Sequence, residues 1–273
     1  MIAAGIVLYN PDEIRLAENI ASVKHQFDNI ILYNNGPTLS DSISEICQGC
    51  IIIGNKGNVG IAAALNAICD YADTNFSADW ILTLDQDSIC PSNLSKEYGK
   101  FLDLPNVAML CPEINDRNFG IMAYDAAGRE EFEEVESCIT SASLLKISIW
   151  REIGGFWEDL FIDMVDFDIC WSIHERGYKI YRINSVSLTH EIGHGRLVRF
   201  RGQDAVAYNH APIRDYYIAR NNILVGKKHG KLNQCFRWGL KRFLIIMRFE
   251  GNRPAKMWHM LKGLIHGLLG ISG

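Results

Sequence analysis

The chain has 273 residues, of which 48% are hydrophobic and 22% charged, with only 7 prolines. This composition is typical of one large globular domain, with or without an appendage, and excludes a disordered chain. The net charge of -5 hides an asymmetry, because residues from Lys227 onward carry ten Lys or Arg and one Glu, a net +9, and the preceding residues carry -14. Nucleic acid is a poor partner for such an acidic body.

Strand-like and helix-like segments alternate from the N-terminus, which predicts an α/β fold with a mainly parallel central sheet flanked by helices. The expected strands cover residues 2–9, 29–33, 50–54, 80–85, 107–110, 178–183 and 186–189. The expected helices cover residues 12–25, 40–47, 58–72, 91–102, 147–153 and 163–176. Residues 113–136 are acidic and predict a loop or an edge hairpin with a solvated charged face.

Targeting and cysteine signals are weak. The first strand meets a turn at Asn10-Pro11, too early for a signal peptide, and no apolar run approaches the ~20 residues of a spanning helix. The 8 cysteines lie singly in apolar segments, apart from Cys47 and Cys50, which favours reduced thiols in a cytoplasmic protein. One Cys-x-x-Cys without a second pair is weak evidence for zinc.

An apolar run that begins at Trp80 ends in two carboxylates, Asp85 and Asp87. Ligands of open α/β sheets bind beyond the carboxyl ends of the strands, and alternate residues of an extended segment project to the same side. The two acids can therefore reach one divalent cation, which would hold a diphosphate. The alternative is a surface turn whose acids cap the next helix.

Three further features carry candidate chemistry. Gly57-Asn58-Val59-Gly60 opens a helix that could receive phosphate or sugar oxygens, although a tight loop explains it equally well. Asp163, Asp166 and Asp168 begin another helix, where the dipole alone favours acids, but three in six residues exceed what capping needs. His190 follows a strand and is a candidate ligand or a structural histidine.

In their order and spacing these features resemble the family-2 inverting glycosyltransferases with the GT-A fold, and among them the bacterial rhamnosyltransferases most. The resemblance covers roughly residues 2–225 and predicts a GT-A catalytic domain over 1–226 and a basic helical tail over 227–273. The matching segments are Tyr9-Asn10, Asn58-Val59-Gly60 with Asn66, Leu84-Asp85-Gln86-Asp87-Ser88, Gly154-Gly155-Phe156, Asp166-Phe167-Asp168, Gly177-Tyr178, His190 and Tyr217-Ile218-Ala219-Arg220-Asn221.

The resemblance implies inverting transfer of a sugar, L-rhamnose from dTDP-L-rhamnose, to a hydroxyl of a glycan or lipid-linked oligosaccharide in cell-surface polysaccharide biosynthesis, such as O-antigen or capsule. Asp166 is implied as the general base, with Asp163 and Asp168 as competitors. Mg²⁺ or Mn²⁺ would be bound by Asp87, assisted by Asp85 and His190. The implied nucleotide-sugar-binding residues are Tyr9, Asn10, Asn34, Asn58, Gly60, Asn66, Asp85, Gln86, Asp87 and Arg220.

The chain departs from the family pattern at three places. Asn34-Asn35-Gly36-Pro37 stands where the family often has Asp-Asn-Gly-Ser, which puts the usual carboxylate contact to the pyrimidine in doubt. Val165 and Ser172 replace the usual Glu and Arg of the catalytic helix, so acceptor contacts are open. A UDP-sugar donor and a non-catalytic nucleotide-binding or membrane-scaffold protein remain alternatives, whereas a dinucleotide oxidoreductase lacks Gly-x-Gly-x-x-Gly after the first strand.

The tail predicts two basic amphipathic helices, over residues 231–249 and 257–269. Such helices lie on an anionic membrane surface, which would place the protein peripherally on the inner face of the bacterial cytoplasmic membrane. They are equally consistent with packing against the catalytic domain or against a second subunit in a homodimer.

Overall fold

The structure is a computed structural model that describes residues 1–54, 57–116, 120–121, 130–190, 195–200 and 202–271. The chain forms two compact units, which are described separately: Met1–Glu158 with Ile169–Glu191, and Asp159–Asp168 with Ile192–Gly273. Residues 192–226 thus group with the C-terminal helices. The predicted boundary of a catalytic domain after residue 226 stays a prediction.

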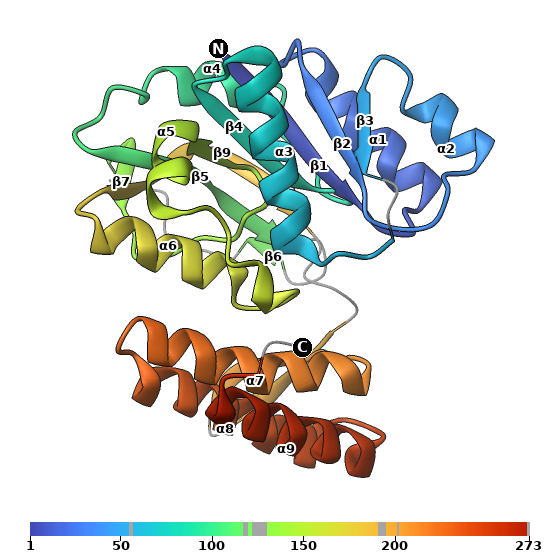
Figure 1. Ribbon diagram of the computed structural model, residues 1–273, viewed down its shortest axis with the longest axis vertical. Coiled ribbons are helices and arrows are strands. Elements are labelled where there is room, and N and C mark those ends of the chain that lie inside the picture. Colours follow the sequence, from blue (N-terminus) through green and yellow to red (C-terminus); the bar gives the residue numbers. More distant parts are fainter. Residues whose placement is uncertain (55–56, 117–119, 122–129, 191–194, 201, 272–273) are drawn as a thin grey trace. The chain divides into compact units, whose positions relative to one another are not determined.

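Within its described residues, the first unit contains a nine-stranded mixed sheet with the strand order β3-β2-β1-β4-β8-β5-β9-β7, and β6 pairs with β5 (Figure 1). The strands are β1 (Ile2–Leu8), β2 (Ile30–Asn34), β3 (Ile51–Gly54), β4 (Trp80–Asp85), β5 (Val107–Asp116), β6 (Gly120–Ile121), β7 (Phe132–Glu134), β8 (Ser143–Lys146) and β9 (Lys179–His190). Neighbours among β1 to β4 are parallel, as are β5 and β9, whereas β8 is antiparallel to β4 and β5. The predicted α/β fold with a mainly parallel sheet is confirmed.

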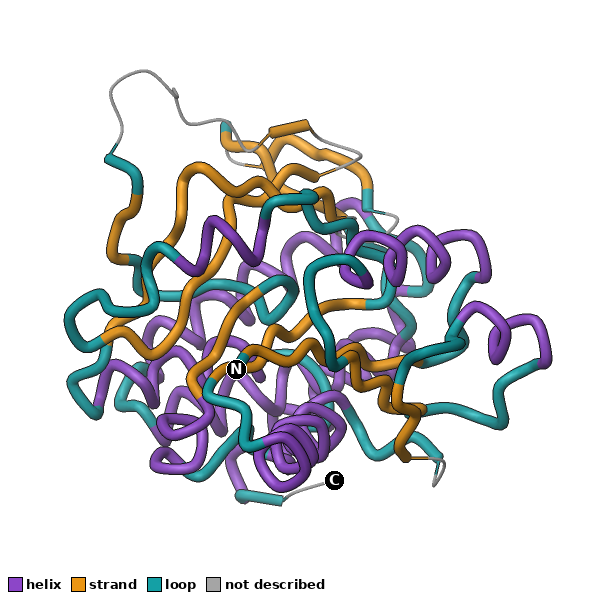
Figure 2. The backbone as a smooth tube through the Cα atoms, turned by 90° about the horizontal axis from the view of Figure 1, so that it is seen from above, coloured by secondary structure: helices purple, strands orange, loops and turns teal. Residues whose placement is uncertain are grey.

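Helices lie on both faces of this sheet (Figure 1), and Figure 2 distinguishes helices, strands and loops by colour. The helices of the unit are α1 (Glu13–Lys24), α2 (Asp41–Ile46), α3 (Ile61–Phe76), α4 (Leu94–Gly99), α5 (Ile147–Ile153) and most of α6 (Val165–Glu175). Asp12 and Ser40 cap α1 and α2 by accepting backbone N–H groups, as their residue types favour. Helix α3 packs so closely that a Cβ at Gly5 would lie 2.2 Å from Ile68.

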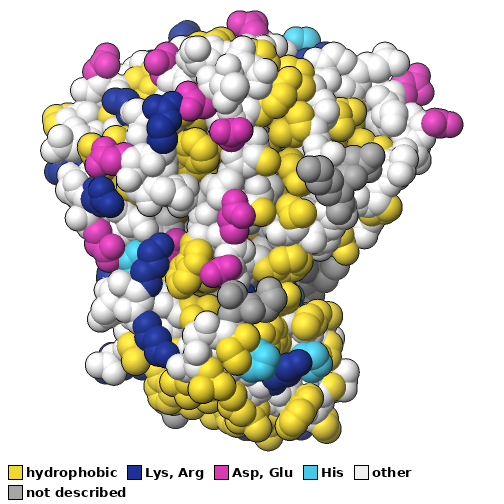
Figure 3. Space-filling view, viewed as in Figure 1, with side chains coloured by type: hydrophobic (Ala, Val, Ile, Leu, Met, Phe, Trp, Pro, Cys, Tyr) yellow, Lys and Arg dark blue, Asp and Glu magenta, His cyan; other side chains and the backbone are white. Residues whose placement is uncertain are grey.

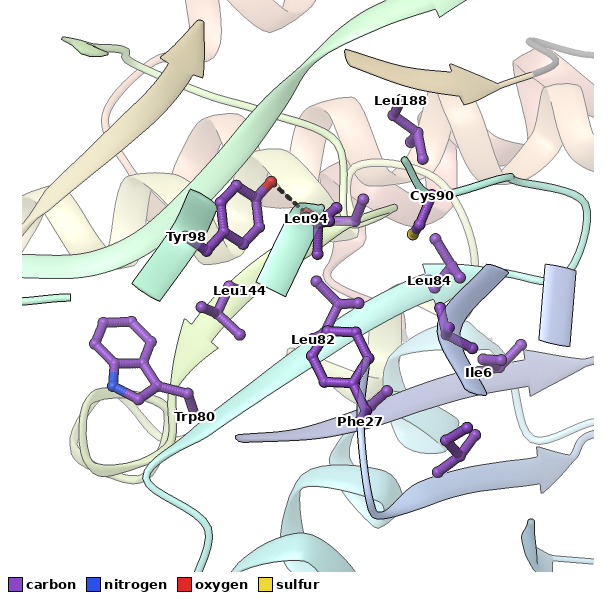
Figure 4. Packing of buried hydrophobic residues seen from close by; sticks show 14 of the residues in the cluster. Ile6, Phe27, Trp80, Leu82, Leu84, Cys90, Leu94, Tyr98, Leu144 and Leu188 are labelled. Carbon is purple, nitrogen blue, oxygen red and sulfur yellow. Dashed lines mark hydrogen bonds between the residues drawn. The ribbon is translucent and has the colours of Figure 1, made fainter. Parts of the chain in front are cut away.

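The core on the opposite face joins α1 and α4 to the central strands (Figure 4). It is built from alternate residues of the strands, such as Leu82 and Leu84 of β4, which lie together with Leu94 and Tyr98 of α4. The buried Tyr98 hydroxyl donates to the carbonyl oxygen of Ala142 at 2.8 Å, so its polar atom is satisfied within the core.

Several predicted boundaries differ from the observed elements. Residues 179–190 form one strand, because Asn184 and Ser185 are accommodated by a register shift opposite Pro112 and Glu113. Helix α4 is shorter than the predicted helix over 91–102. The acidic segment contributes the edge strand β7, and the rest of the predicted hairpin over 117–119 and 122–129 lies outside the described residues.

The second unit contains an antiparallel hairpin and three long helices, and the sequence analysis predicted neither the hairpin nor the first helix. The elements are β10 (Arg196–Phe200), β11 (Gln203–Ala207), α7 (Pro212–Lys228), α8 (Leu232–Phe249) and α9 (Arg253–Leu269). Helices α7 and α9 cross at very short range, since a Cβ at Gly263 would lie 2.2 Å from the Tyr216 carbonyl oxygen. In the described part of the chain, no helix combines the length and apolarity needed to span a bilayer.

A buried charge network ties these helices together. Arg242 of α8 donates to Asp215 of α7 at 2.8 Å and to Glu250, and Lys256 of α9 donates to Glu250 at 2.6 Å. Arg242 and Lys256 are only 9% and 1% exposed. These two basic residues of the tail are therefore paired with acids inside the unit, and contact of the exposed basic residues with a membrane stays a prediction.

Candidate functional site

The carboxyl ends of β1, β2, β3 and β4 meet at one edge of the sheet of the first unit. Because the strands are parallel and Val7 pairs with Asp85, Leu8 with Asn34 and Asn34 with Gly54, residues that follow these strands come together there. We call this set of strand ends the carboxyl edge. Ligands of α/β sheets bind at such edges. Tyr9, Asn34 and Asp85 lie at this edge, and their contact with a nucleotide sugar stays a prediction.

Three buried polar side chains hold the turn Asp85 to Ser88 that follows β4. Asn19 of α1 donates its Nδ2 hydrogens to the carbonyl oxygens of Asp85 and Ser88, at 2.8 and 2.7 Å. The Ser141 hydroxyl accepts the N–H of Asp85 at 3.1 Å and lies 2.9 Å from the Ser88 hydroxyl. Asn19, Ser88 and Ser141 are fully buried. The acidic turn is therefore fixed in shape before any ligand arrives.

Sequence reasoning did not find Asn19 or Ser141. One signal was available for Asn19, because it is a polar residue on the apolar face of α1, beside the buried Leu16, Ile20 and Val23. Such a residue has to find hydrogen-bond partners in the interior. Ser141 gives no comparable signal, since its partners are more than fifty residues away in the chain.

Gln86 lies between the two acids, and its side chain is used by the fold. Its amide accepts the N–H of Tyr9 at 2.8 Å and donates to the carbonyl oxygen of Tyr9 at 3.0 Å. The Tyr9 side chain is 49% exposed beyond the end of β1, and the following Asn10 adopts a left-handed conformation with φ 45°. Tyr9 and Asn10 thus stand at the carboxyl edge beside the acidic turn.

Asp87 carries the observation that fits a cation. Its Oδ1 atom is buried and has no hydrogen-bond partner among the described residues. An unpartnered buried carboxylate oxygen is costly unless a donor or a cation meets it, and Mg²⁺ and Mn²⁺ prefer oxygen ligands. Asp85 and Asp87 therefore fit a divalent cation, although the described residues contain no cluster of three metal-binding side chains.

The predicted third ligand, His190, has a side chain outside the described residues. Its backbone ends β9, and the preceding residue Thr189 exchanges backbone hydrogen bonds of 3.0 and 3.3 Å with Ile89. Ile89 follows the acidic turn directly. The exit of β9 thus lies beside the turn that carries Asp85 and Asp87.

Asn34 closes its own turn. Its Oδ1 accepts the N–H of Gly36 at 3.1 Å, and its Nδ2 donates to the carbonyl oxygen of Pro37 at 2.9 Å. An aspartate at this position could accept the first of these bonds but could not donate the second. The turn therefore explains why the chain has asparagine rather than aspartate at residue 34. Contact of Asn34 with a nucleotide stays a prediction.

Asn35, which the sequence analysis did not select, connects this turn to the start of α3. Its Oδ1 accepts the N–H of Val59 at 2.8 Å, and its Nδ2 donates to Asn58 Oδ1 at 3.2 Å. Asn58 Oδ1 also accepts the N–H of Gly60, whose φ of 87° suits glycine. The predicted residues Asn58 and Gly60 are therefore held against the carboxyl edge through Asn35.

Asn66 of α3 holds the turn around Gly155. Its Oδ1 accepts from Trp150 Nε1 at 3.0 Å and from the N–H of Phe156 at 2.8 Å, and its Nδ2 donates to the Phe156 carbonyl oxygen and to Glu158. A Cβ at Gly155 would lie 2.7 Å from Asn66 Oδ1. Asn66 positions this turn, and its contact with a sugar stays a prediction.

The acids of the second unit differ sharply in their surroundings. Asp163 is paired with Arg214 at 3.0 Å. Asp168 is 1% exposed and lies 2.8 Å from both Lys228 Nζ and His229 Nε2. Asp166, in the first turn of α6, is partly exposed and accepts the N–H of Phe167 at 2.9 Å. Accessibility therefore separates Asp163 and Asp166, which are partly exposed, from the buried Asp168.

Arg220 and Asn221 of α7 hold the segment that leads into α6. The fully buried Arg220 donates through Nη2 to the carbonyl oxygens of Asp159 and Leu160, and it stacks against the ring of Tyr217. Asn221 Nδ2 donates to the carbonyl oxygens of Leu160, Ile162 and Asp163 at 2.7–3.0 Å. Contact of Arg220 with a nucleotide sugar stays a prediction.

This segment needs such support because three of its residues have left-handed backbones. The φ angles of Phe161, Asp163 and Met164 are 61°, 66° and 66°. Each such conformation costs a non-glycine residue of order 1 kcal/mol and persists only where the surroundings impose it. Arg220 and Asn221 supply those surroundings, so they set where α6 and Asp166 begin.

Comparison with known proteins agrees with the predicted resemblance. Residues 4–162, more than half of the chain, match the model of the family described as Glycosyl transferase family 2. Over 291 aligned residues, the chain is 27% identical to the dTDP-rhamnosyl transferase RfbF of Shigella flexneri, covering 100% of this chain and 97% of that protein.

Solved structures agree with the predicted fold. The crystal structure of GalNAc-T7 with UDP, GalNAc and Mn²⁺ matches 90% of this chain with a TM-score of 0.60 and 12% identity, and this chain spans 57% of that one. The crystal structure of S. aureus TarS 1-349 in complex with UDP-GlcNAc matches this chain with a TM-score of 0.59 and 12% identity. The match covers 97% of this chain and 81% of the TarS chain. The predicted GT-A fold is confirmed.

Proposed function

Because this chain belongs to glycosyl transferase family 2, we propose that it transfers L-rhamnose from dTDP-L-rhamnose to a hydroxyl of a glycan or lipid-linked oligosaccharide. The full-length similarity to a dTDP-rhamnosyl transferase is the observation that supports this donor. A UDP-sugar is the second candidate donor, because the structural relatives were solved with UDP or UDP-GlcNAc. We propose that the transferred carbon is inverted.

Asp85 and Asp87 would hold the cofactor, Mg²⁺ or Mn²⁺, with His190 as the proposed third ligand. The buried, unpartnered Oδ1 of Asp87 supports this assignment. The cation would supply positive charge to the diphosphate that leaves with the nucleoside. Tyr9, Asn10, Asn58 and Gly60 belong to the same carboxyl edge and are the proposed neighbours of the nucleotide sugar.

Asp166 is the proposed general base. The acceptor oxygen forms a bond to the anomeric carbon, the bond from that carbon to the diphosphate oxygen breaks, and the acceptor proton passes to the Asp166 carboxylate. Such a base acts within about 3 Å of the hydroxyl. The resemblance to the family supports this choice, and the burial of Asp168, which is 1% exposed, makes that competitor a poorer candidate.

The acceptor class follows from the same proposal. We assign the reaction to cell-surface polysaccharide assembly, of the O-antigen or capsule kind, and place the protein on the cytoplasmic side of the membrane. Contact of the basic C-terminal helices with the membrane would bring the enzyme to a lipid-linked acceptor. Association with a second copy is the alternative use of the same helices.

A donor screen tests the proposal. The purified full chain is incubated with dTDP-L-rhamnose, UDP-GlcNAc or UDP-GalNAc, with a lipid-linked oligosaccharide extract, and with MnCl₂ or EDTA. We expect release of dTDP from dTDP-L-rhamnose alone, with loss in EDTA, and an inverted linkage in the product by NMR. Release of UDP instead would replace the donor, and nucleotide binding without donor consumption would indicate the non-catalytic alternative.

A further inference from the structure

A large apolar groove lies between the helices of the second unit. It has a volume of about 520 Å³ and is lined by α7, α8 and α9, including Ile223, Phe236, Leu240, Phe243, Trp258 and Leu261. Among its lining residues, Asn222 is the one with a polar amide side chain. We call it the α8–α9 groove. Its volume lies within the ~300–1,000 Å³ of sites that bind small organic molecules.

The rim of this groove exposes large side chains that globular proteins usually cover. Phe236 and Leu240 of α8 are 54% and 48% exposed, and Trp258 and Leu261 of α9 are 65% and 49% exposed. Figure 3 shows hydrophobic side chains gathered over the helices of this unit. Single exposed apolar residues are ordinary, but a contiguous group around a groove marks a binding surface.

One polar side chain, that of Asn222, lines the otherwise apolar groove. Asn222 is 5% exposed, and its Nδ2 donates to the carbonyl oxygen of Ile218 within α7 at 2.8 Å. Its Oδ1 is buried and has no hydrogen-bond partner among the described residues. A water molecule at the edge of the groove would satisfy this acceptor, so the argument for the occupant depends on the apolar lining and the neighbouring charge.

The charge beside the groove is positive. Arg237, Lys241 and Arg248 are exposed and each follows an exposed apolar residue of α8, so a basic stripe runs along the apolar one. Across the described residues 227–271, the sole acid is Glu250, and it is buried against Arg242 and Lys256. The exposed charge of α8 and α9 therefore favours an anionic amphiphile.

From this combination we propose that the α8–α9 groove binds a hydrocarbon chain of an anionic membrane phospholipid, whose headgroup phosphate meets Arg237 and Lys241. A second copy of this chain is a poorer occupant, because symmetric pairing would bring two basic stripes together. The proposal rests on the helical unit alone. Its outcome is therefore separate from that of the proposed rhamnosyl transfer.

Filling the groove tests the proposal. A Cβ at Gly239, which lines the groove, would meet no atom within 4 Å, so Gly239→Phe places a ring in open space. Asn233→Phe adds the same ring at an exposed position of α8 outside the groove lining. If the apolar surface of the helices simply partitions into the membrane, both variants should bind membranes as well as the wild type or better. If a lipid hydrocarbon chain inserts into the groove, Gly239→Phe should bind more weakly and Asn233→Phe should not.

The assay uses the full chain with phosphatidylcholine vesicles, with or without phosphatidylglycerol, and measures co-flotation and quenching of tryptophan by brominated lipid. We expect wild-type and Asn233→Phe proteins to bind anionic vesicles at least ten times more tightly than neutral ones, with quenching that Trp258→Phe reduces. We expect Gly239→Phe and the double variant Arg237→Glu with Lys241→Glu to lose at least fivefold in affinity.

Circular dichroism melting establishes that each variant is folded, and Leu240→Ser serves as a second groove variant if Gly239→Phe is not. Unchanged vesicle binding by the folded groove variants would overturn the proposal. So would a wild-type protein that does not distinguish anionic from neutral vesicles. A dimer in sedimentation equilibrium that Gly239→Phe dissociates would assign the groove to a second copy instead.

Discussion

Gln86 pairs with the backbone of Tyr9 through both ends of its side-chain amide, at 2.8 and 3.0 Å. The arrangement extends the pairing of β1 with β4, in which Val7 is opposite Asp85, beyond the ends of the strands. The side chain of Gln86, between the two acids, thus holds the ends of β1 and β4 together. Of the two neighbouring acids, Asp87 has a buried carboxylate oxygen without a partner among the described residues, which a ligand can meet.

Gln86→Glu should weaken donor binding, because a carboxylate keeps the acceptor for Tyr9 N–H but faces the Tyr9 carbonyl oxygen without a donor. A lost hydrogen bond with an unsatisfied partner costs about 1–3 kcal/mol, so we expect roughly tenfold weaker binding of dTDP. Isothermal titration calorimetry measures this change. Gln48→Glu, at an exposed position, is the control, and equal affinities in both variants would exclude the pairing as a determinant of the site.

Asp87→Asn separates metal binding from stability. Since Asp87 Oδ1 is buried without a described partner, removing its charge should not lower the thermal stability of the metal-free protein. In the wild type, MnCl₂ at a concentration of about a hundred times its dissociation constant should stabilise the fold by about 2.7 kcal/mol. This stabilisation should disappear in Asp87→Asn. Differential scanning fluorimetry with and without MnCl₂ measures both effects.

Asp70→Asn on the exposed side of α3 is the matched control for Asp87→Asn and should respond to MnCl₂ like the wild type. A full manganese response in Asp87→Asn would show that the cation binds elsewhere. A large loss of stability without metal would show instead that Asp87 has a structural role.

The fold of the first unit could be predicted because its signals are local. The apolar run that ends at Asp85 is recognisable from neighbouring residues alone, and the structure has it as the strand that the sequence predicts. The role of Asn66 could not be read in this way, because its hydrogen-bond partners are 84 to 92 residues away.

The second unit was harder to predict for a related reason. Helix α7 is buried on most sides from Asp215 onward, so it lacks the polar face that identifies an amphipathic helix. The buried state of Arg242 depends on Asp215, 27 residues earlier in the chain. A count of basic residues in the tail assigns Arg242 to the surface because it does not include this partner.

Two of the acids near the start of α6, Asp166 and Asp168, predict different phenotypes. Asp166→Asn should fold and bind donor normally and lose about 10²–10⁴-fold in kcat, because the acceptor proton has no base. Asp168→Asn should lower the free energy of unfolding by about 1–3 kcal/mol, since the buried His229 and the partly exposed Lys228 lose their bonds to a carboxylate. Steady-state kinetics and urea unfolding of both variants test this division, and full activity of Asp166→Asn would refute it.

Glu250 gives the helical unit a defined response to acid. Burial alone would raise its pKa, but hydrogen bonds from Arg242 and Lys256 outweigh burial and lower the pKa of Glu250 to about 2 from its ordinary 4.5. An acid with a lowered pKa stabilises the fold above its unfolded-state pKa, and this stabilisation is lost as the pH falls from about 4.5 toward about 2. Between about pH 6 and about pH 3 the loss from this group should be about 2 kcal/mol.

Glu250→Gln should therefore be less stable than the wild type at about pH 6, and the difference should shrink as the pH falls to about 3. Burial raises the pKa of Asp215, which works in the opposite direction, but Asp215 is present in both proteins, so the difference reports chiefly on Glu250. Urea unfolding across this pH range measures it. Asp204→Asn, an exposed acid of the same unit, should show no such convergence, and a constant gap between wild type and Glu250→Gln would contradict the proposed role of the charge network.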